Sequence, residues 1–546
     1  MSVIEKQKTD LNQKKLKFAL SVAVPLIIFA VTVAAFGMHY RTNDDATLAN
    51  LAAGGYGNLV RILHINVIFS LMMKPFYTLA QFNWYVILQM ALVLVSISVI
   101  FYIFMDKLGV KKGLLLCLAI LLPFAPYLFY TFQYTKTGAV IISAGLILIA
   151  DSLGQKDKKT LFGIILCALG SMLRWENFFA IGGLSAFLLL SEFFPLDKKG
   201  KKRAIITMIS FFAVIGIIRT VDVLAYKATP EWDFFVKYNK ARTEYSDYKV
   251  YYLNENNPFE NLGIDDAEYA VLNDWDFYDG ENFTIDLLEK LSAQVQGKSI
   301  KTAIVETSHR TVNLFHGESY RYVFLLTVLR AVLCFRFKID YLYLIGLFAT
   351  FGCEFLFLIW RGRYTDWVEV GILWAVVIFA VYMIIKLKPS LFNKNILVLC
   401  LLALCVMSVP SLKQTYNNSI DHFTRKHLYD QSLNAMSRDK ENLYIISVKS
   451  LDAMAGYDIL HPRTNNFYSN IVACGGWLSQ SPHRNAALAK YGVKRPIVDG
   501  VDNPHVYFTD SNIGNMTRYA ESQLGKKVVA VRTGENPFAP YQLITE

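Results

Sequence analysis

The sequence predicts a mainly α-helical protein that crosses a membrane many times and ends in a small α/β domain. Three observations predict this class. Hydrophobic residues make up 54% of the 546 residues, and charged residues only 18%. Apolar runs of roughly 20 residues, each long enough to cross a bilayer, recur through the first three quarters of the chain. The last quarter is polar and contains short segments rich in β-branched and aromatic residues, which favour strands.

The charges are distributed as membrane topology requires. The net charge is +11, but most lysines and arginines lie in short clusters between apolar runs. No basic stripe interleaved with aromatic residues is present, so the charge does not indicate nucleic-acid binding. No Cys-x-x-Cys or Cys/His spacing predicts a zinc site.

The N-terminal segment predicts which side of the membrane each loop occupies. Residues 1–17 are rich in lysine and precede the apolar run Phe18–Met38. No small-residue cleavage site follows, so we expect a retained anchor with a cytoplasmic N-terminus. This orientation places the loop 39–83 on the extracytoplasmic side.

The apolar stretch His64–Ala80 is predicted to lie along the outer membrane surface. If it crossed the membrane, the lysine clusters at 156–159 and 198–203 would fall outside and break the positive-inside pattern. The stretch begins with a histidine and is interrupted by Lys74-Pro75, which suits an interfacial helix.

About eleven membrane spans follow from this assignment, within a transmembrane domain at 18–411. Their expected bounds are 18–38, 84–105, 113–130, 137–150, 161–173, 177–194, 204–225, 320–335, 339–360, 366–385 and 395–411.

Two large regions are expected outside the membrane. One is the loop 226–319, whose acidic stretch Asn254–Glu289 contains no lysine or arginine. Within that stretch, Trp275 or Tyr278 offers a surface for a sugar, although such runs are usually solvated faces. The other region is a C-terminal α/β domain at 412–546. Its predicted strands are Leu443–Val448, Val506–Phe508 and Val528–Arg532, and its predicted helices are Leu433–Arg438 and Asn515–Leu524.

Two adjacent carboxylates, Asp44 and Asp45, follow the first span directly. Carboxylates are costly near hydrocarbon, so a pair at the membrane surface indicates a functional site. Successive residues on a helix point about 100° apart, so one carboxylate can face a substrate while the other caps the helix or binds a cation. The alternative is that both only cap the helix that follows.

Arginines at span ends on the same side form the second candidate site. Arg174 and Glu176 end one span, and the segment 361–366, with Arg361, Arg363 and Tyr364, joins two others. A guanidinium can hold a phosphate through two hydrogen bonds and remains charged near lipid. The alternatives are anchoring to lipid head groups and ion pairs with Glu176 or Asp366.

This order of features resembles the GT-C superfamily of integral membrane glycosyltransferases, which use polyprenyl-phosphate sugars. The resemblance covers the whole architecture through short motifs, and it extends to bacterial membrane proteins with a similar Asn-Asp-Asp opening. It implies that Asp44 or Asp45 acts on an acceptor hydroxyl or helps to hold a metal. It also implies that His64, at the start of the interfacial helix, orients a carboxylate or touches phosphate. Some members require a divalent cation, Mg²⁺ or Mn²⁺, and others do not.

The expected function is transfer of a sugar from a polyprenyl-phosphate donor to a lipid-linked or cell-surface glycan at the outer face of the membrane. Asp44, or less favourably Asp45, would be the base, and Arg361, Arg363 and Arg174 would hold the lipid phosphate. A transporter or flippase of lipid-linked sugars is an alternative, which Arg219, Asp222 and Arg330 near the apolar runs keep open. A non-catalytic protein of surface polysaccharide assembly is another.

Overall fold

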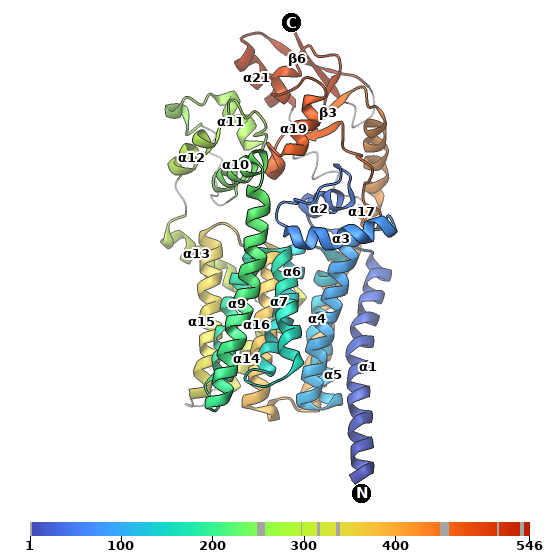
Figure 1. Cartoon of the computed structure of the whole chain (residues 1–546), viewed down its shortest axis with the longest axis vertical. Helices are drawn as coiled ribbons and strands as arrows, with labels where there is room; N and C mark the ends of the chain where they lie inside the picture. Colours follow the sequence, from blue (N-terminus) through green and yellow to red (C-terminus); the bar gives the residue numbers. More distant parts are fainter. Residues whose placement is uncertain are drawn as a thin grey trace.

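The computed structural model describes residues 3–247, 257–295, 298–313, 317–334, 339–447, 458–509, 513–534 and 540–546. Long helices form a bundle with the N-terminus at its far end, and a smaller domain with the C-terminus covers the opposite end (Figure 1). Val448, the last residue of the predicted strand Leu443–Val448, lies outside the described residues.

The bundle contains one helix for each expected span. Its helices are α1 (Val3–Phe36), α4 (Trp84–Leu108), α5 (Val110–Ala125), α6 (Tyr134–Asp151), α7 (Lys158–Leu173), α8 (Trp175–Phe193), α9 (Lys198–Lys227), α14 (Ser319–Leu333), α15 (Ile339–Trp360), α16 (Asp366–Leu387) and α17 (Lys394–Arg438). In the described ranges, nine helices are long and apolar enough to cross a membrane. The predicted spans 161–173 and 320–335 correspond to the shorter α7 and α14, of 16 and 15 residues. The chain is therefore a polytopic α-helical membrane protein.

Close packing of α6 against α7 brings two cavity residues together. A Cβ atom on Gly138 would lie 3.0 Å from the carbonyl oxygen of Gly170, so only small residues allow this approach. Tyr134 lies one turn before Gly138, and Arg174 lies one turn after Gly170. The crossing therefore sets the distance between Tyr134 and Arg174.

Helix α3 (Val67–Leu79) lies across the end of the bundle, roughly perpendicular to the long helices (Figure 1). The carboxylate of Asp222 in α9 accepts a hydrogen bond from the Val67 amide at 2.9 Å, and Arg219 pairs with Asp222 at 2.9 Å. These two charges thus anchor the N-terminus of α3. Leu71 and Leu79 of α3 are exposed, as expected for a helix that rests on a membrane surface.

Six further helices and a five-stranded sheet build the domain at the end of the bundle. Its helices are α10 (Pro230–Ser246), α11 (Asp266–Asn273), α12 (Ile285–Gln294), α19 (Pro482–Ala489), α20 (Pro496–Asp499) and α21 (Ile513–Leu524). The five strands, in spatial order, are β4 (Ile471–Ala473), β3 (Leu443–Ile446), β5 (Val506–Thr509), β7 (Tyr541–Thr545) and β6 (Val528–Arg532). Strands β4, β3 and β5 are parallel, whereas β7 runs antiparallel to β5 and β6.

The loop and the C-terminal region, which the sequence separates, share one hydrophobic core. Phe277 and Phe283 of the loop pack in the same cluster as Phe508 and Leu543 of the C-terminal region. We call this unit, residues 230–294 and 439–546, the head domain. The acidic stretch is only partly a solvated face, because Asp274, Asp276, Asp279 and Tyr278 are buried in this domain, whereas acids toward its two ends, such as Asp266 and Asp286, are exposed. The predicted helix Leu433–Arg438 is the end of α17, which continues the last span into the head domain.

Candidate functional site

A cavity of about 1150 Å³ lies where the head domain meets the bundle. Its apolar wall comes from α8, α15 and α16, with Phe179, Phe357 and Ile372. Its polar wall comes from both parts of the molecule. The described lining includes six arginines, Arg41, Arg174, Arg242, Arg361, Arg363 and Arg484, and five acids, Asp44, Glu176, Asp247, Asp274 and Glu354. An apolar wall beside a cationic one suits a ligand with a hydrophobic part and an anionic group.

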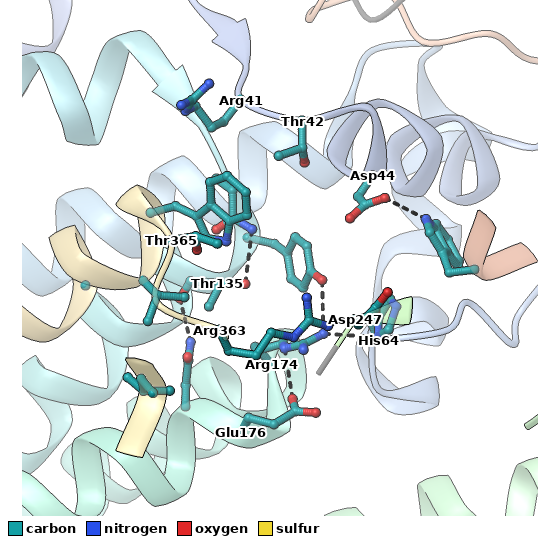
Figure 2. Close-up of a pocket in the computed structure, with 18 of the residues that line it drawn as sticks. Arg41, Thr42, Asp44, His64, Thr135, Arg174, Glu176, Asp247, Arg363 and Thr365 are labelled. Carbon is teal, nitrogen blue, oxygen red and sulfur yellow. Dashed lines mark hydrogen bonds and ion pairs between the residues drawn. The ribbon is translucent and has the colours of Figure 1, made fainter. Parts of the chain in front are cut away.

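Asp44 stands in the first turn of α2 (Asn43–Ala53) and lines the cavity. The indole nitrogen of Trp477 donates a hydrogen bond to its Oδ1 atom at 2.7 Å, drawn in Figure 2. A carboxylate at a helix N-terminus is favoured by the helix dipole. The head domain therefore holds one of the two predicted catalytic carboxylates in the cavity wall.

Asp45 has a different environment. It is fully buried and is not among the lining residues of the cavity. It accepts hydrogen bonds from the Thr42 hydroxyl at 2.7 Å and the Tyr134 amide at 3.0 Å. Burial raises the pKa of Asp45 to about 8, against the effect of these two hydrogen bonds. The contacts tie α2 to the start of α6, behind the cavity wall.

Arg174, between α7 and α8, links Tyr134 at the start of α6, Glu176 in the first turn of α8 and His64 in the loop before α3. It pairs with Glu176 at 2.9 Å, and one terminal nitrogen lies 3.0 Å from His64 Nδ1 and 3.1 Å from the Tyr134 hydroxyl (Figure 2). A guanidinium only donates, so Nδ1 of His64 must accept and the proton of the neutral ring sits on Nε2. The structure therefore brings three of the predicted site residues, Arg174, Glu176 and His64, together.

His64 is neutral and held in an unusual backbone conformation. Burial, followed by the charge of Arg174, keeps the pKa of His64 well below its usual value. Its φ angle is +75°, a region that side-chain-bearing residues rarely adopt, and its ring lies 5.2 Å from that of Trp477. The strain places the imidazole between Arg174 and the indole that holds Asp44.

Arg361 and Arg363 both pair with α10 or the segment that follows it. Arg363 lies 2.8 Å from Asp247, and Arg361 lies 3.5 Å from Glu244. Asp247 also pairs with the buried Arg242 at 3.0 Å. Although burial opposes ionisation, the guanidinium groups of Arg242 and Arg363 hold the pKa of Asp247 below its usual value. The predicted arginine pair is thus positioned by head-domain carboxylates on the cavity wall.

Tyr364, grouped with these arginines in the sequence, is not among the lining residues of the cavity. Its ring packs edge-on against Phe355 at 4.6 Å and lies beneath the guanidinium of Arg310 at 5.5 Å. The side chain is only 8% exposed. The structure gives Tyr364 a packing position behind the phosphate-site candidates rather than beside them.

Several cavity residues were not predicted from the sequence. Trp477 follows Gly475-Gly476, and a Cβ atom on Gly475 would lie 1.7 Å from the carbonyl oxygen of Trp275. Only glycine permits this approach, so the Gly-Gly-Trp motif in the sequence indicates a close backbone contact at this position. Trp275, by contrast, was one of the two aromatic candidates of the acidic stretch, and it lines the cavity with φ +68° and 39% of its side chain exposed. Arg242, Asp247 and Arg484 had no comparable signal.

The carboxylates do not assemble into a metal site in the described ranges. No group of three or more His, Cys, Asp or Glu side chains with metal-ligand spacing occurs there. Asp44 accepts its hydrogen bond from Trp477, and Asp45 is turned toward Thr42 and Tyr134. This donor set does not fit a divalent cation, so Mg²⁺ or Mn²⁺ stays a prediction from the resemblance alone.

Glu354 brings a carboxyl group to the cavity from within the span α15. Its Oε2 atom is buried and has no hydrogen-bond partner among the described residues. A carboxyl group inside a membrane span that faces a cavity indicates contact with a polar ligand.

Comparisons of this chain with known proteins find one similar solved structure. No protein-family model matches it, and no curated protein matches it. The fold is similar to the crystal structure of ArnT from Cupriavidus metallidurans bound to undecaprenyl phosphate. The two are 11% identical over 96% of this chain and 97% of that chain, with a TM-score of 0.36.

Proposed function

We propose that the protein is a membrane glycosyltransferase that moves a sugar from a polyprenyl-phosphate donor to a lipid-linked or cell-surface glycan, at the extracytoplasmic face. The observation that supports this most is the composition of the cavity. One wall is apolar and belongs to membrane helices, and the other holds several arginines and Asp44. A lipid-linked sugar phosphate has the same division into an apolar chain and an anionic, hydroxyl-rich head.

The lipid phosphate binds at Arg361 and Arg363. Both side chains already have a carboxylate partner, which fixes their direction on the cavity wall. The apolar residues of α8 and α15, including the exposed Phe179 and Phe357, receive the lipid chain beside them. Arg174, held by Glu176 and His64, adds positive charge on the bundle side. Charge-assisted hydrogen bonds to the phosphate stabilise it as it leaves.

Asp44 is the general base. It takes the proton of the acceptor hydroxyl as that oxygen bonds to the anomeric carbon of the donor sugar. The bond from that carbon to the phosphate oxygen breaks, and polyprenyl phosphate leaves with the electron pair. The hydrogen bond from the Trp477 indole to Oδ1 orients the Asp44 carboxylate. Asp45 supports α2 and takes no part in proton transfer.

Trp275 is the stacking surface for a sugar ring. It is the exposed aromatic side chain of the acidic stretch in the cavity, whereas Tyr278 is buried and donates to Asn485 at 2.8 Å. Of the two aromatic candidates in that stretch, the proposal therefore assigns the role to Trp275.

The test is the substitution Asp44→Asn. The variant keeps an oxygen for the Trp477 hydrogen bond and loses the base, so transfer is expected to fall by about 10²–10⁴-fold. The readout is the pool of lipid-linked sugar and the surface glycan, at matched protein levels. Asp286→Asn, an exposed carboxylate of the head domain, is the matched control and should leave both unchanged. Unchanged glycan in Asp44→Asn would sink the assignment.

A further inference from the structure

Arg484 differs from the other arginines of the cavity. In the described lining, Arg41, Arg174, Arg242, Arg361 and Arg363 each form an ion pair with a carboxylate. Arg484 forms none with any carboxylate that the structure describes. Its Nη1 atom donates to the carbonyl oxygens of Ala473 at 3.5 Å and Gly475 at 3.4 Å, which are long hydrogen bonds.

The charge of Arg484 is also buried. The side chain is 3% exposed, and its Nε atom has no hydrogen-bond partner among the described residues. The Tyr56 hydroxyl is a further neighbour, and burial raises its pKa, so it supplies no negative charge to Arg484. A buried guanidinium without a carboxylate is costly to the fold. Such a group in a cavity wall indicates that an anion completes it when ligand is bound.

We propose that Arg484 binds an anionic group of the acceptor, a phosphate or a carboxylate, on the head-domain side of the cavity. Arg484 and Trp477 belong to one segment, and Trp477 holds Asp44. Arg361 and Arg363 come from the connection between α15 and α16. The donor phosphate and the acceptor anion thus have separate cationic groups, and Asp44 is held by the segment that binds the acceptor. The inference rests on the proposed transferase function and adds the class of acceptor.

The first experiment measures binding and needs no activity. Full-length protein in detergent is titrated with inorganic phosphate and, separately, with methyl glucuronide. The comparison shows whether Arg484 prefers a phosphate or a carboxylate. Each series is run with and without a short-chain polyprenyl phosphate, which fills the bundle-side arginines. Arg484→Gln is expected to weaken binding of the preferred anion at least about tenfold in both series, and Arg484→Lys about threefold or less.

A matched control and a stability measurement separate binding from a structural role. Arg518→Gln removes an exposed arginine of the same domain and should leave anion binding unchanged. Without anion, Arg484→Gln should unfold at the same temperature as wild type or higher, because a buried unpaired charge is gone. Unchanged anion affinity in Arg484→Gln, or no binding of either probe by wild type, would overturn the proposal. A lower unfolding temperature with unchanged affinity would also overturn it.

The second experiment measures transfer. Arg484→Gln should raise the KM for the acceptor about tenfold or more and leave the KM for the polyprenyl-phosphate donor unchanged. A rise in the donor KM alone would contradict the assignment. Absence of transfer by wild type would refute the proposed function, while the anion titration would still report on Arg484.

Discussion

Two adjacent carboxylates have opposite environments at the start of α2. Asp44 faces the cavity and the Trp477 indole, whereas Asp45 is buried against Thr42 and the Tyr134 amide. The difference follows from helix geometry, because successive side chains point about 100° apart. Neither carboxyl group caps α2, whose N-cap is Thr42 without a side-chain capping hydrogen bond, so the capping interpretation of the pair is wrong, and Asp45 instead binds the first amide of α6.

Asp45 is expected to make stability depend on pH. Its pKa is about 8 in the folded chain and 3.8 as a free side chain, so between these values the folded state binds the extra proton. The contribution of Asp45 to the free energy of unfolding is therefore fully present below pH 4, declines as the pH rises and is lost above about pH 8. The free energy of unfolding changes by at most about 1.4 kcal/mol per pH unit in this range. Thermal unfolding of Asp45→Asn against wild type from pH 4 to 8 measures it. A constant difference across that range would refute the expectation.

Trp477→Phe should lower transfer without unfolding the protein. The change keeps the ring beside His64 and removes the hydrogen bond to Asp44. A hydrogen bond to a charged group contributes about 1.5–3 kcal/mol, so kcat is expected to fall about 10–100-fold. Trp367→Phe, at another tryptophan of the cavity wall, is the control and should change kcat less. An equal loss in both variants would show that the Asp44 contact is not the cause.

At the scale of elements, one glycine turn joins the head domain to the loop before α3, and another joins the two parts of the head domain. Gly55 accepts a hydrogen bond from the Tyr468 amide at 2.8 Å, and a Cβ atom there would lie 2.7 Å from the carbonyl oxygen of Arg463. Gly475 makes the corresponding close approach to Trp275. Both turns lie near α2 or the cavity, so backbone contacts that only glycine allows set the position of the site.

Gly475→Ala should disrupt the cavity, and Gly514→Ala should not. The new methyl group at position 475 would overlap the Trp275 carbonyl and displace the Trp477 loop, with a cost of about 2 kcal/mol or more in the free energy of unfolding. Gly514 lies in α21 with open space around it, so alanine there should be neutral or stabilise by up to about 1 kcal/mol. Thermal unfolding and transfer assays on both variants measure the contrast, which an equal stability of the two would contradict.

The elements that the sequence predicted are those defined by local patterns. Long apolar runs predicted the bundle helices, and β-branched runs predicted β3, β5 and β6. Strand β4 has only three residues, and β7 has Gln542 next to its central Leu543, so neither carries a clear pattern. The length of α17 was also missed, because its polar continuation to Arg438 is stabilised by contacts outside the helix.

At the scale of the whole molecule, the cavity is built by segments far apart in the chain. Asp44, Arg174, Arg361 and Arg363 could be predicted because charges at the ends of membrane spans are unusual in themselves. Arg484 could not be predicted, because its neighbours in the sequence show no pattern that distinguishes it. Its position in the cavity arises only when the head domain folds over the bundle. The same holds for the pairing of Arg242 with Asp247. Asp222, which with Arg219 and Arg330 keeps a transporter open as an alternative in the sequence, anchors α3 in the structure.

The C-terminal region is expected not to fold without the loop. Asp279 of the loop accepts hydrogen bonds from Arg495 at 2.8 Å and Tyr519 at 2.7 Å, and Phe277 and Phe283 complete the core behind the sheet. A fragment of residues 439–546 would expose this apolar surface and leave Arg495 without its carboxylate. Circular dichroism and thermal unfolding should show a cooperative transition only when residues 230–294 are linked to the fragment.

The linked fragment also contains its own control. Asp279→Ala in it should lower the unfolding temperature, because Arg495 then has no carboxylate partner and the Tyr519 hydroxyl loses its acceptor. Asp286→Ala, which removes an exposed i, i+4 pair with Lys290, should change it little. A cooperative transition in residues 439–546 alone would mean that the two regions are separate domains, and that the loop only rests on the sheet.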